Sequence, residues 1–333
     1  MYHTSGFAEA ASFFVPGYAA VVSMLGYVAR RILGAIPTLA VIVTLAFLMT
    51  RLAPGGPFDE EQALPPEIRA NLESAYGLDQ PMTVQFGRYV GGLLHGDFGP
   101  SFKFRDFTVS ELIASGLPVS LIIGAAAVAL ALLLGIPAGI WAALAQDRLA
   151  DRAVMTLAVV GISVPVFVVA PFLALVFGIY LHWLPVAGWA PGRPSDLVLP
   201  VVTLALPVVA YLARLTRGSM LEVLRAPWIR AARARGLPRY RVLLWHALPG
   251  ALLPVVSYLG PTAAAVLTGS LVVETIFGLP GMGRHLVQGA LNRDYTLVMG
   301  MVIVYATLMI ALNLIADLVY AWLDPRIRQE RRR

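Results

Sequence analysis

The sequence has no cysteine and only one lysine, Lys103, among its 333 residues. Without cysteine the chain can form neither a disulfide bond nor a thiolate metal site, and its redox compartment is left open. A phosphate-binding loop of the form GxxxxGK[ST] needs glycine directly before its lysine, but Phe102 stands there. The chain therefore lacks a nucleotide-binding loop of this kind, and any use of ATP would depend on another subunit.

Charged residues are also scarce. They make up 13% of the chain, against 58% hydrophobic residues, and the mean hydropathy is +0.75. This composition is outside the usual range of soluble domains and indicates a membrane protein. The net charge of +6 comes mainly from basic residues beside apolar runs, which favours membrane topology over nucleic-acid binding. The histidines show no ligand spacing, so we expect no metal site; they are His3, His95, His182, His246 and His285.

Two further classes of protein lack their expected residues. The sequence contains neither GxSxG nor HExxH, so an intramembrane hydrolase has no visible site and we predict no catalytic residue. An ion-coupled secondary transporter would have paired acids near the bilayer midplane, whereas the apolar runs here are nearly free of charge. A secondary transporter is therefore the less favoured alternative.

Long uncharged runs separate the charged residues. A helix needs roughly 20 apolar residues to cross a bilayer. Six runs are long enough: they lie between Arg31 and Arg51, Glu111 and Asp147, Arg152 and Arg193, Asp196 and Arg214, Arg241 and Glu274, and Asp294 and Asp317. We therefore predict an all-α integral membrane protein with six transmembrane helices. The second, third and fifth runs exceed one span, so we expect tilted, interfacial or re-entrant segments there.

The runs also suggest a division of the chain. Met24 opens the sequence MLGYVARRIL and looks like a more natural start than Met1. The predicted units are a weakly ordered extension (1–23), the first span (24–52), an extracytoplasmic loop with short helices around 66–76 (53–111), a five-span core (112–325) and a basic tail (326–333). The long loop could be a partner surface or a solvated connector, and the sequence leaves both open.

Arginines are unevenly distributed between the two sides of the membrane. With the N-terminus inside, that side holds Arg30, Arg31, Arg148, Arg152, the arginines from 214 to 241 and those from 326 to 333. The first loop on the other side is rich in Asp and Glu instead. Because basic residues favour the cytoplasmic side, we expect both termini in the cytoplasm.

Prolines and one acid within the spans each allow two interpretations. The prolines are Pro37, Pro118, Pro137, Pro165, Pro171, Pro200, Pro207, Pro254 and Pro261. They could break helices around a pathway, or reflect the general tolerance of membrane helices for proline. Asp317 near the end of the last span could be functional or could simply pair with a basic residue.

The basic segment from Tyr211 to Pro254 is too patterned for a plain connector. Met220 to Leu224 suits a helix, Pro227 interrupts it, and Ile229 to Arg235 suits a short second helix. Gly236 then permits a sharp reversal. A short helix held between two turns could be a rigid knob for a partner, whereas a basic loop held by lipid head groups is the plainer alternative.

This segment resembles the integral-membrane subunits of ATP-binding-cassette importers. Their signature is Glu-Ala-Ala, three residues, Gly, nine residues, Ile, any residue and Leu-Pro. The corresponding residues here are Arg230, Ala231, Ala232, Gly236, His246, Leu248 and Pro249. Arg230 and His246 depart from the general signature, but ARARGL and HAL are similar to the oligopeptide, dipeptide and nickel branch of the family.

Other segments extend the resemblance along nearly the whole chain from Met24. They are MLGYVARRILGAIPTL, YGLDQPMTVQFGRYV, GDFGPSF, WLPVAG and VVETIFGLPGMGRHLVQGALNRDYTLVMG. The family implies a six-span core of the type I importer permease fold, located in the bacterial inner membrane. It also implies a partner permease, two cytoplasmic ATPases that bind ATP and Mg, and an extracytoplasmic solute-binding protein. We expect this chain to bind no cofactor itself.

The resemblance assigns candidate roles to two sets of residues. A coupling loop at about 214–250 would dock a cytoplasmic ATPase through Leu221, Glu222, Arg230, Ala231, Ala232, Arg233, Ala234, Arg235, Gly236, Leu237, His246, Leu248 and Pro249. An outer gate or a docking surface for the binding protein would include Glu274, Phe277, Pro280, Gly281, Gly283, Arg293 and Asp294. A plain tight turn is the alternative for the stretch GLPGMG. Peptides are the expected cargo, with nickel complexes, opines or glycosides as alternatives.

Overall fold

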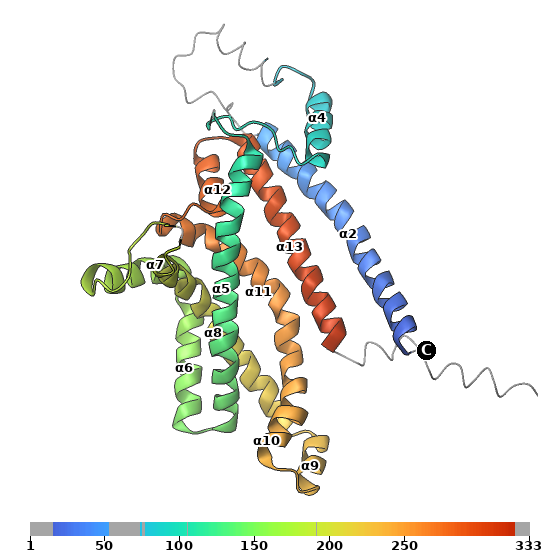
Figure 1. Cartoon of the computed structure of the whole chain (residues 1–333), viewed down its shortest axis with the longest axis vertical. Coiled ribbons are helices and arrows are strands. Elements are labelled where there is room, and N and C mark those ends of the chain that lie inside the picture. The colour runs from blue at the N-terminus through green and yellow to red at the C-terminus, as the bar shows by residue number, and fades with distance from the viewer. Residues whose placement is uncertain (1–15, 53–73, 75–76, 105, 191, 324–333) are drawn as a thin grey trace, which may run out of the picture.

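The computed structural model describes residues 16–52, 74, 77–104, 106–190 and 192–323 (Figure 1). Its regular structure within these residues is helical, and the only β pairing there is an isolated bridge between Pro100 and Thr108. The predicted all-α class is confirmed. The helices are α2 (Pro16–Leu52), α4 (Met82–Leu94), α5 (Val109–Leu144), α6 (Leu149–Ser163), α7 (Val166–Leu173), η1 (Ala174–Tyr180), α8 (Ser195–Leu224), α9 (Pro227–Ala234), α10 (Arg239–Arg241), η2 (Val242–Ala247), α11 (Leu248–Ile276), α12 (Met282–Leu291) and α13 (Tyr295–Leu323).

Five helical stretches are long and apolar enough to cross a membrane, and a bent pair brings the number to six. The five are Ala29–Leu52, Val109–Leu144, Ser195–Leu224, Arg239–Ile276 and Tyr295–Val319. The bent pair joins α6 to α7 and η1 at an angle of 102°. It occupies the third predicted run, where more than a simple span was expected. The second run instead forms the single continuous helix α5.

Prolines seldom break these helices. Pro165 lies at the bend between α6 and α7, where it is the N-cap residue of α7. The other intramembrane prolines of the prediction lie inside continuous helices, as Pro118 and Pro137 do in α5. Neighbouring helices and side-chain hydroxyls can satisfy a carbonyl freed by proline. Most of these prolines therefore reflect the general tolerance of membrane helices for proline. Pro165 alone among them lies at a break between helices.

The long helices run in alternating directions between two ends of the molecule (Figure 1). One end, here called the basic end, contains α9, α10 and the turn from α5 to α6. The opposite end, here called the α12 end, contains α4, α12 and the start of α13. The described chain begins with α2 and finishes with α13, and both of these outer ends are directed toward the basic end.

Helices α5 and α8 pack closely along their length. Gly135 and Gly139 of α5 leave no room for a Cβ atom, because the backbone of α8 lies directly against them. Small residues allow this approach, which supplies packing energy where lipid offers no hydrophobic drive. Ile123, Leu204 and Leu212 belong to the buried cluster around this contact.

Helix α2 lies at the edge of the bundle against α13. Asp317 of α13 pairs there with Arg31 of α2, at 2.7 Å between carboxylate and guanidinium. This is the pairing role for Asp317 that the sequence left open.

Parts of the predicted division lie outside the described residues. These are residues 1–15 of the expected extension, the expected helix around 66–76 except residue 74, and the tail 326–333. Helix α2 begins at Pro16, ahead of Met24, so the expected boundary at residue 24 is not a helix end. In the loop 53–111, the structure describes α4.

Candidate functional site

The basic segment contains the short helix that the sequence predicted. Helix α8 ends at Leu224, and α9 begins at Pro227, a residue whose missing N–H costs nothing at a first helical position. Gly236 follows α9 with φ of 76°, a left-handed conformation that glycine adopts without strain. The segment between the long helices is shorter than the expected loop of 214–250, because α8 continues to Leu224 and α10 begins at Arg239.

Helix α9 is anchored by one face and exposes the other. Ile229 and Ala232 are buried against Met220, Val242 and Ala247, a cluster that joins α8, α9 and η2. Burial of an isoleucine side chain contributes about 1.5–3 kcal/mol. The opposite face of α9 and its C-terminal turn are exposed, and they comprise Arg230, Ala231, Arg233, Ala234 and Arg235. The three arginines make this surface basic. The helix is thus a fixed basic projection at the basic end.

The remaining predicted residues of the loop lie in two environments. Leu221, Leu237 and Leu248 pack against the same buried cluster as Ile229. Glu222, His246 and Pro249 are exposed. The structure therefore places the predicted set around α9, partly as its anchor and partly as its surface.

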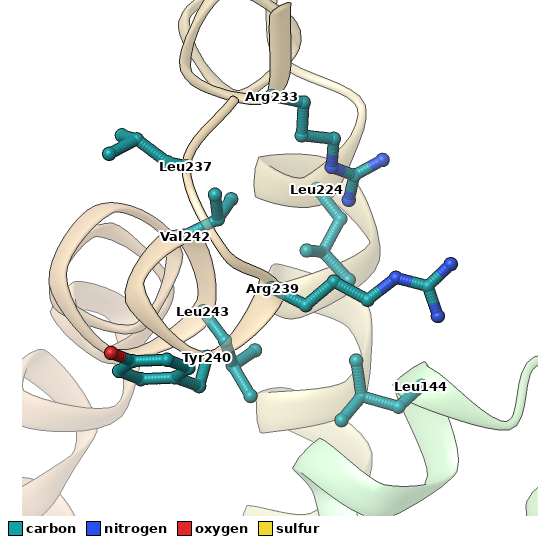
Figure 2. A pocket seen from close by; sticks show the side chains of 8 residues that line it. All are labelled: Leu144, Leu224, Arg233, Leu237, Arg239, Tyr240, Val242 and Leu243. Carbon is teal, nitrogen blue, oxygen red and sulfur yellow. The ribbon is translucent and has the colours of Figure 1, made fainter. Parts of the chain in front are cut away.

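A cavity of about 700 Å³ opens beside α9. Leu144, Leu224 and Leu243 form part of its apolar lining, and Arg233 and Arg239 add guanidinium groups. Figure 2 shows both guanidinium groups extending to the same side of the cavity. Helix α5 contributes Leu144, so this surface combines the basic loop with the end of a long span.

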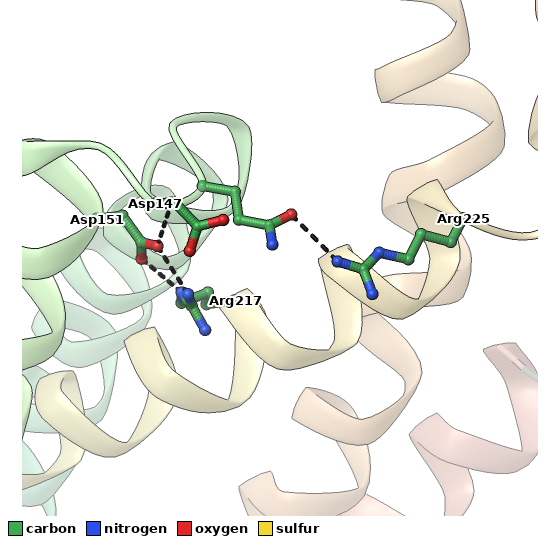
Figure 3. A network of polar contacts seen from close by, with 5 residues as sticks. Asp147, Asp151, Arg217 and Arg225 are labelled. Atoms are coloured by element: carbon green, nitrogen blue, oxygen red, sulfur yellow. Dashed lines mark hydrogen bonds and ion pairs between the residues drawn. The ribbon is translucent and has the colours of Figure 1, made fainter.

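An ion pair fastens the turn from α5 to α6 onto α8 (Figure 3). Arg217 donates from Nε to Asp151 Oδ1 at 2.5 Å and from Nη2 to Oδ2 at 2.7 Å. The backbone N–H of Asp147 also donates to Asp151 Oδ2, at 3.0 Å. Nearer α9, Arg225 donates to Gln146 Oε1 at 3.3 Å. We call Asp151 and Arg217 the clamp; the sequence analysis did not identify either residue as functional.

The clamp should contribute measurably to stability. The Asp151 side chain is 3% exposed, so Asp151→Asn removes the charge that pairs directly with the Arg217 guanidinium and leaves Asp147 as the remaining acid near it. Breaking a buried pair in this way costs about 3–5 kcal/mol, and we expect the lower end because Arg217 is 26% exposed. Thermal unfolding in detergent measures the change.

Gln146→Ala is the matched control, because it removes an exposed hydrogen bond from the same turn. We expect it to change stability by less than about 0.5 kcal/mol. The double exchange Asp151→Arg with Arg217→Asp should recover part of the loss. Equal destabilisation by Asp151→Asn and Gln146→Ala would contradict a clamp.

The α12 end is built around the buried carboxylate of Glu274. Glu274 is fully buried, and its Oε2 accepts a hydrogen bond from the Gly283 N–H at 2.7 Å. The carboxylate lies at the N-terminus of α12, where the helix dipole favours a negative charge. A Cβ atom has no room at Gly281, because of the Glu274 carboxylate, or at Gly283, because of the Leu271 backbone and Glu274. The motif GLPGMG thus packs a turn onto a buried acidic side chain.

Asp294 makes a second buried connection at this end. Its carboxylate accepts hydrogen bonds from Ser101 Oγ, from the Phe102 N–H at 3.2 Å and from the Lys103 N–H at 3.3 Å. It also accepts from Thr296 Oγ1 at 3.0 Å and from the Leu297 N–H at 3.2 Å. Asp294 therefore caps α13 and fixes the loop 101–103. The separate sequence motifs GDFGPSF and NRDYT meet at this carboxylate.

Most of the predicted outer set faces the interior. Glu274, Phe277, Gly281, Gly283 and Asp294 are buried, while Pro280 and Arg293 are half-buried. His285 of α12 is partly buried, and this burial together with Arg284 lowers the pKa of its imidazole. These residues build and position α12, so a docking surface at this end would have to include other, exposed side chains.

Two family models match the chain in consecutive parts. One, described as binding-protein-dependent transport system inner membrane component, matches residues 135–329. The other, for the N-terminal part of such membrane components, matches residues 24–124. The chain belongs to this family. As an inner membrane component of a transport system, it is a multi-pass protein of the inner membrane.

Individual members of the family match this inner membrane component over most of its length. The oligopeptide transport system permease protein OppB of Escherichia coli (strain K12) is 52% identical over 305 residues, which cover 92% of this chain and 100% of that protein. OppB of Haemophilus influenzae is 49% identical over 305 residues, with the same coverage of 92% and 100%. The dipeptide transport system permease protein DppB of Bacillus subtilis (strain 168) is 40% identical over 305 residues, covering 92% and 98%.

A solved structure supports the fold of this inner membrane component. A chain of the MetNI methionine ABC transporter, solved in inward-facing conformations, superposes with a TM-score of 0.55. The match covers 64% of this chain and 96% of the solved chain, at 17% sequence identity. The predicted importer permease fold is thereby confirmed.

Proposed function

We propose that this chain is the permease subunit of an ATP-binding-cassette importer for peptides, and that it forms half of the translocation path. The observation that carries the proposal is its 52% identity to an oligopeptide permease over 92% of the chain. The 40% identity to a dipeptide permease points to the same class of cargo. Peptides are therefore favoured over nickel complexes and other small solutes.

The energy for transport would come from two ATPase subunits that bind ATP and Mg. The absence of a nucleotide-binding loop around Lys103 supports a separate motor. Helix α9 would occupy a groove on an ATPase, because it is a short, anchored helix with exposed arginines. A second permease subunit would complete the path, and a solute-binding protein would deliver the peptide.

Movement of the ATPases would be passed on by α9. Its anchor joins α8 to η2, and η2 continues into α11, so a displacement of α9 would move both spans. The clamp would extend this movement to α5 and α6. A packed group of this kind can switch between two discrete arrangements that open the path to either side.

The orientation of the chain follows from the same proposal. The basic end would face the cytoplasm, in accordance with its arginines, and both termini would lie there. The α12 end would face outward. Its residues Glu274, Phe277, Pro280, Gly281, Gly283, Arg293 and Asp294 would then hold α12 as part of an outer gate.

Co-purification tests the role of α9. The ATPases encoded with this chain should be recovered with it from detergent extracts of cells that express the complete transporter. Reversing two exposed charges of α9, by Arg230→Glu with Arg233→Glu, should abolish their recovery. Arg193→Glu reverses an exposed charge before α8, away from the basic end, and is the matched control. Undiminished recovery with the α9 variant would contradict the proposal.

A further inference from the structure

Two cavities lie along the same pair of helices, α8 and α11. One has a volume of about 260 Å³ and is lined by residues that include Pro207, Tyr258 and Gly269. The other has a volume of about 370 Å³ and includes Arg214, Glu222 and Pro254. Tyr211 lines both cavities, so they meet at this side chain, and we call the two together the groove.

The groove follows one stripe of each helix. On α8 its residues recur at intervals of three or four, through Pro207, Tyr211, Arg214, Gly218 and Glu222. On α11 the same spacing relates Pro254, Tyr258, Thr262, Ala265 and Gly269. Residues at this spacing share a helix face. The groove therefore extends along both spans rather than crossing them at one point.

An aromatic pair divides the groove. The rings of Tyr211 and Tyr258 stack with centroids 4.1 Å apart and an interplanar angle of 20°. The Arg214 guanidinium lies 5.6 Å from the centroid of the Tyr211 ring. On one side of the pair the groove is mainly apolar, with Val166, Leu204 and Val208. On the other side it contains Arg214, Ser219 and Glu222.

Arg214 indicates that this groove faces water. Its side chain is exposed, and no carboxylate among the described residues pairs with it. Arg217, one turn further along α8, is by contrast paired with Asp151. Arg214 ends the predicted fourth span, so its unpaired charge indicates that water reaches the end of the groove nearer the basic end.

We propose that this groove is the surface over which the transported peptide passes. The stacked rings of Tyr211 and Tyr258 form an aromatic step on which peptide side chains and amide planes pack. Arg214 receives a carboxylate of the peptide, because guanidinium and carboxylate form charge-assisted hydrogen bonds. The inference rests on the proposed function and adds the residues that meet the cargo.

Photo-crosslinking tests the position of the peptide. Benzoylphenylalanine is introduced in place of Tyr258 in the complete transporter, which is reconstituted with its binding protein and supplied with radiolabelled peptide and ATP. The same group in place of Trp141 is the control, since Trp141 is exposed on α5 and lines neither cavity. We expect label on the chain at position 258 and not at position 141. Equal labelling at both positions, or none at 258, would overturn the proposal.

Charge removal tests Arg214 separately. Uptake of a peptide with a free C-terminal carboxylate is compared with uptake of its C-terminal amide, each relative to the wild-type transporter. Arg214→Gln should lower uptake of the acid about tenfold more than uptake of the amide, while Arg214→Lys should retain an intermediate rate. An equal effect on both peptides would overturn the role of Arg214. Absence of uptake by the wild-type transporter would instead overturn the proposed function.

Discussion

Asp294→Ala is expected to destabilise the protein by about 3 kcal/mol or more. The substitution removes an acceptor shared by two side-chain hydroxyls and three backbone N–H groups, in a buried site. Each buried donor left without an acceptor costs about 1–3 kcal/mol. Thr296 retains its hydrogen bond to the Pro100 carbonyl at 2.7 Å, so the Ser101 hydroxyl and the Leu297 N–H account for most of the loss.

Thermal unfolding of the purified protein in detergent measures this effect. The apparent midpoint should fall by about 5 °C or more. Asp106→Ala removes an exposed carboxylate from the same loop and should leave the midpoint nearly unchanged. Asp294→Asn keeps one acceptor oxygen and should lie between the two. A midpoint for Asp294→Ala equal to that of Asp106→Ala would show that Asp294 does not hold this end together.

Gly236→Val is expected to reduce ATP-dependent peptide uptake about tenfold while ATP hydrolysis continues. The cause is backbone conformation rather than space, because no atom lies within 4 Å of a Cβ placed at Gly236. Its φ of 76° costs an L-residue about 1–2 kcal/mol, and a β-branched side chain fits it worst. Relief of that strain would shift α9 relative to α11, and 1.4 kcal/mol corresponds to a factor of about ten.

Gly236→Asn is the informative control. Asparagine is larger than glycine but tolerates the left-handed conformation, so its uptake should stay close to that of the wild type. Uptake and ATP hydrolysis are measured on the same reconstituted vesicles, with the amount of inserted chain determined by immunoblot. Uptake by Gly236→Val at the wild-type rate would contradict the proposal that α9 transmits the movement of the ATPases.

The fold class and the short helix of the basic segment could be predicted from the sequence because their causes are local. Uncharged runs of span length fix most of the membrane helices, whatever their neighbours are. Pro227 and Gly236 set the limits of α9 through backbone chemistry that needs no distant partner. The order of these signals along the chain was therefore enough to predict the fold class and the position of α9.

The clamp and the buried carboxylates could not be predicted from local sequence signals. Asp151 and Arg217 are 66 positions apart, and only the close packing of α5 and α6 on α8 brings them together. Asp294 likewise bonds to Ser101, 193 positions away. Their sequence signal was limited to acids beside long apolar runs, which equally suits a residue at the water interface. Burial depends on the assembled bundle, so the sequence could assign Glu274 to an outer gate or docking surface but could not show that its side chain is fully buried.

The bend between α6 and α7 shows a similar limit. The length of the third run indicated an additional element, but the sequence offered several prolines as breaking points. Pro171 lies within α7, whereas Pro165 lies at the bend. Helices α8 and α11 contact α7 in the folded bundle, and the sequence of the third run alone does not contain this information.

Peptide uptake into proteoliposomes tests the central proposal most directly. The chain is reconstituted with its partner permease, both ATPases and the binding protein, and accumulation of a radiolabelled oligopeptide is followed with and without ATP. We expect accumulation only when ATP, the ATPases and the binding protein are all present. Accumulation by the purified chain alone, driven by an ion gradient, would contradict the central proposal.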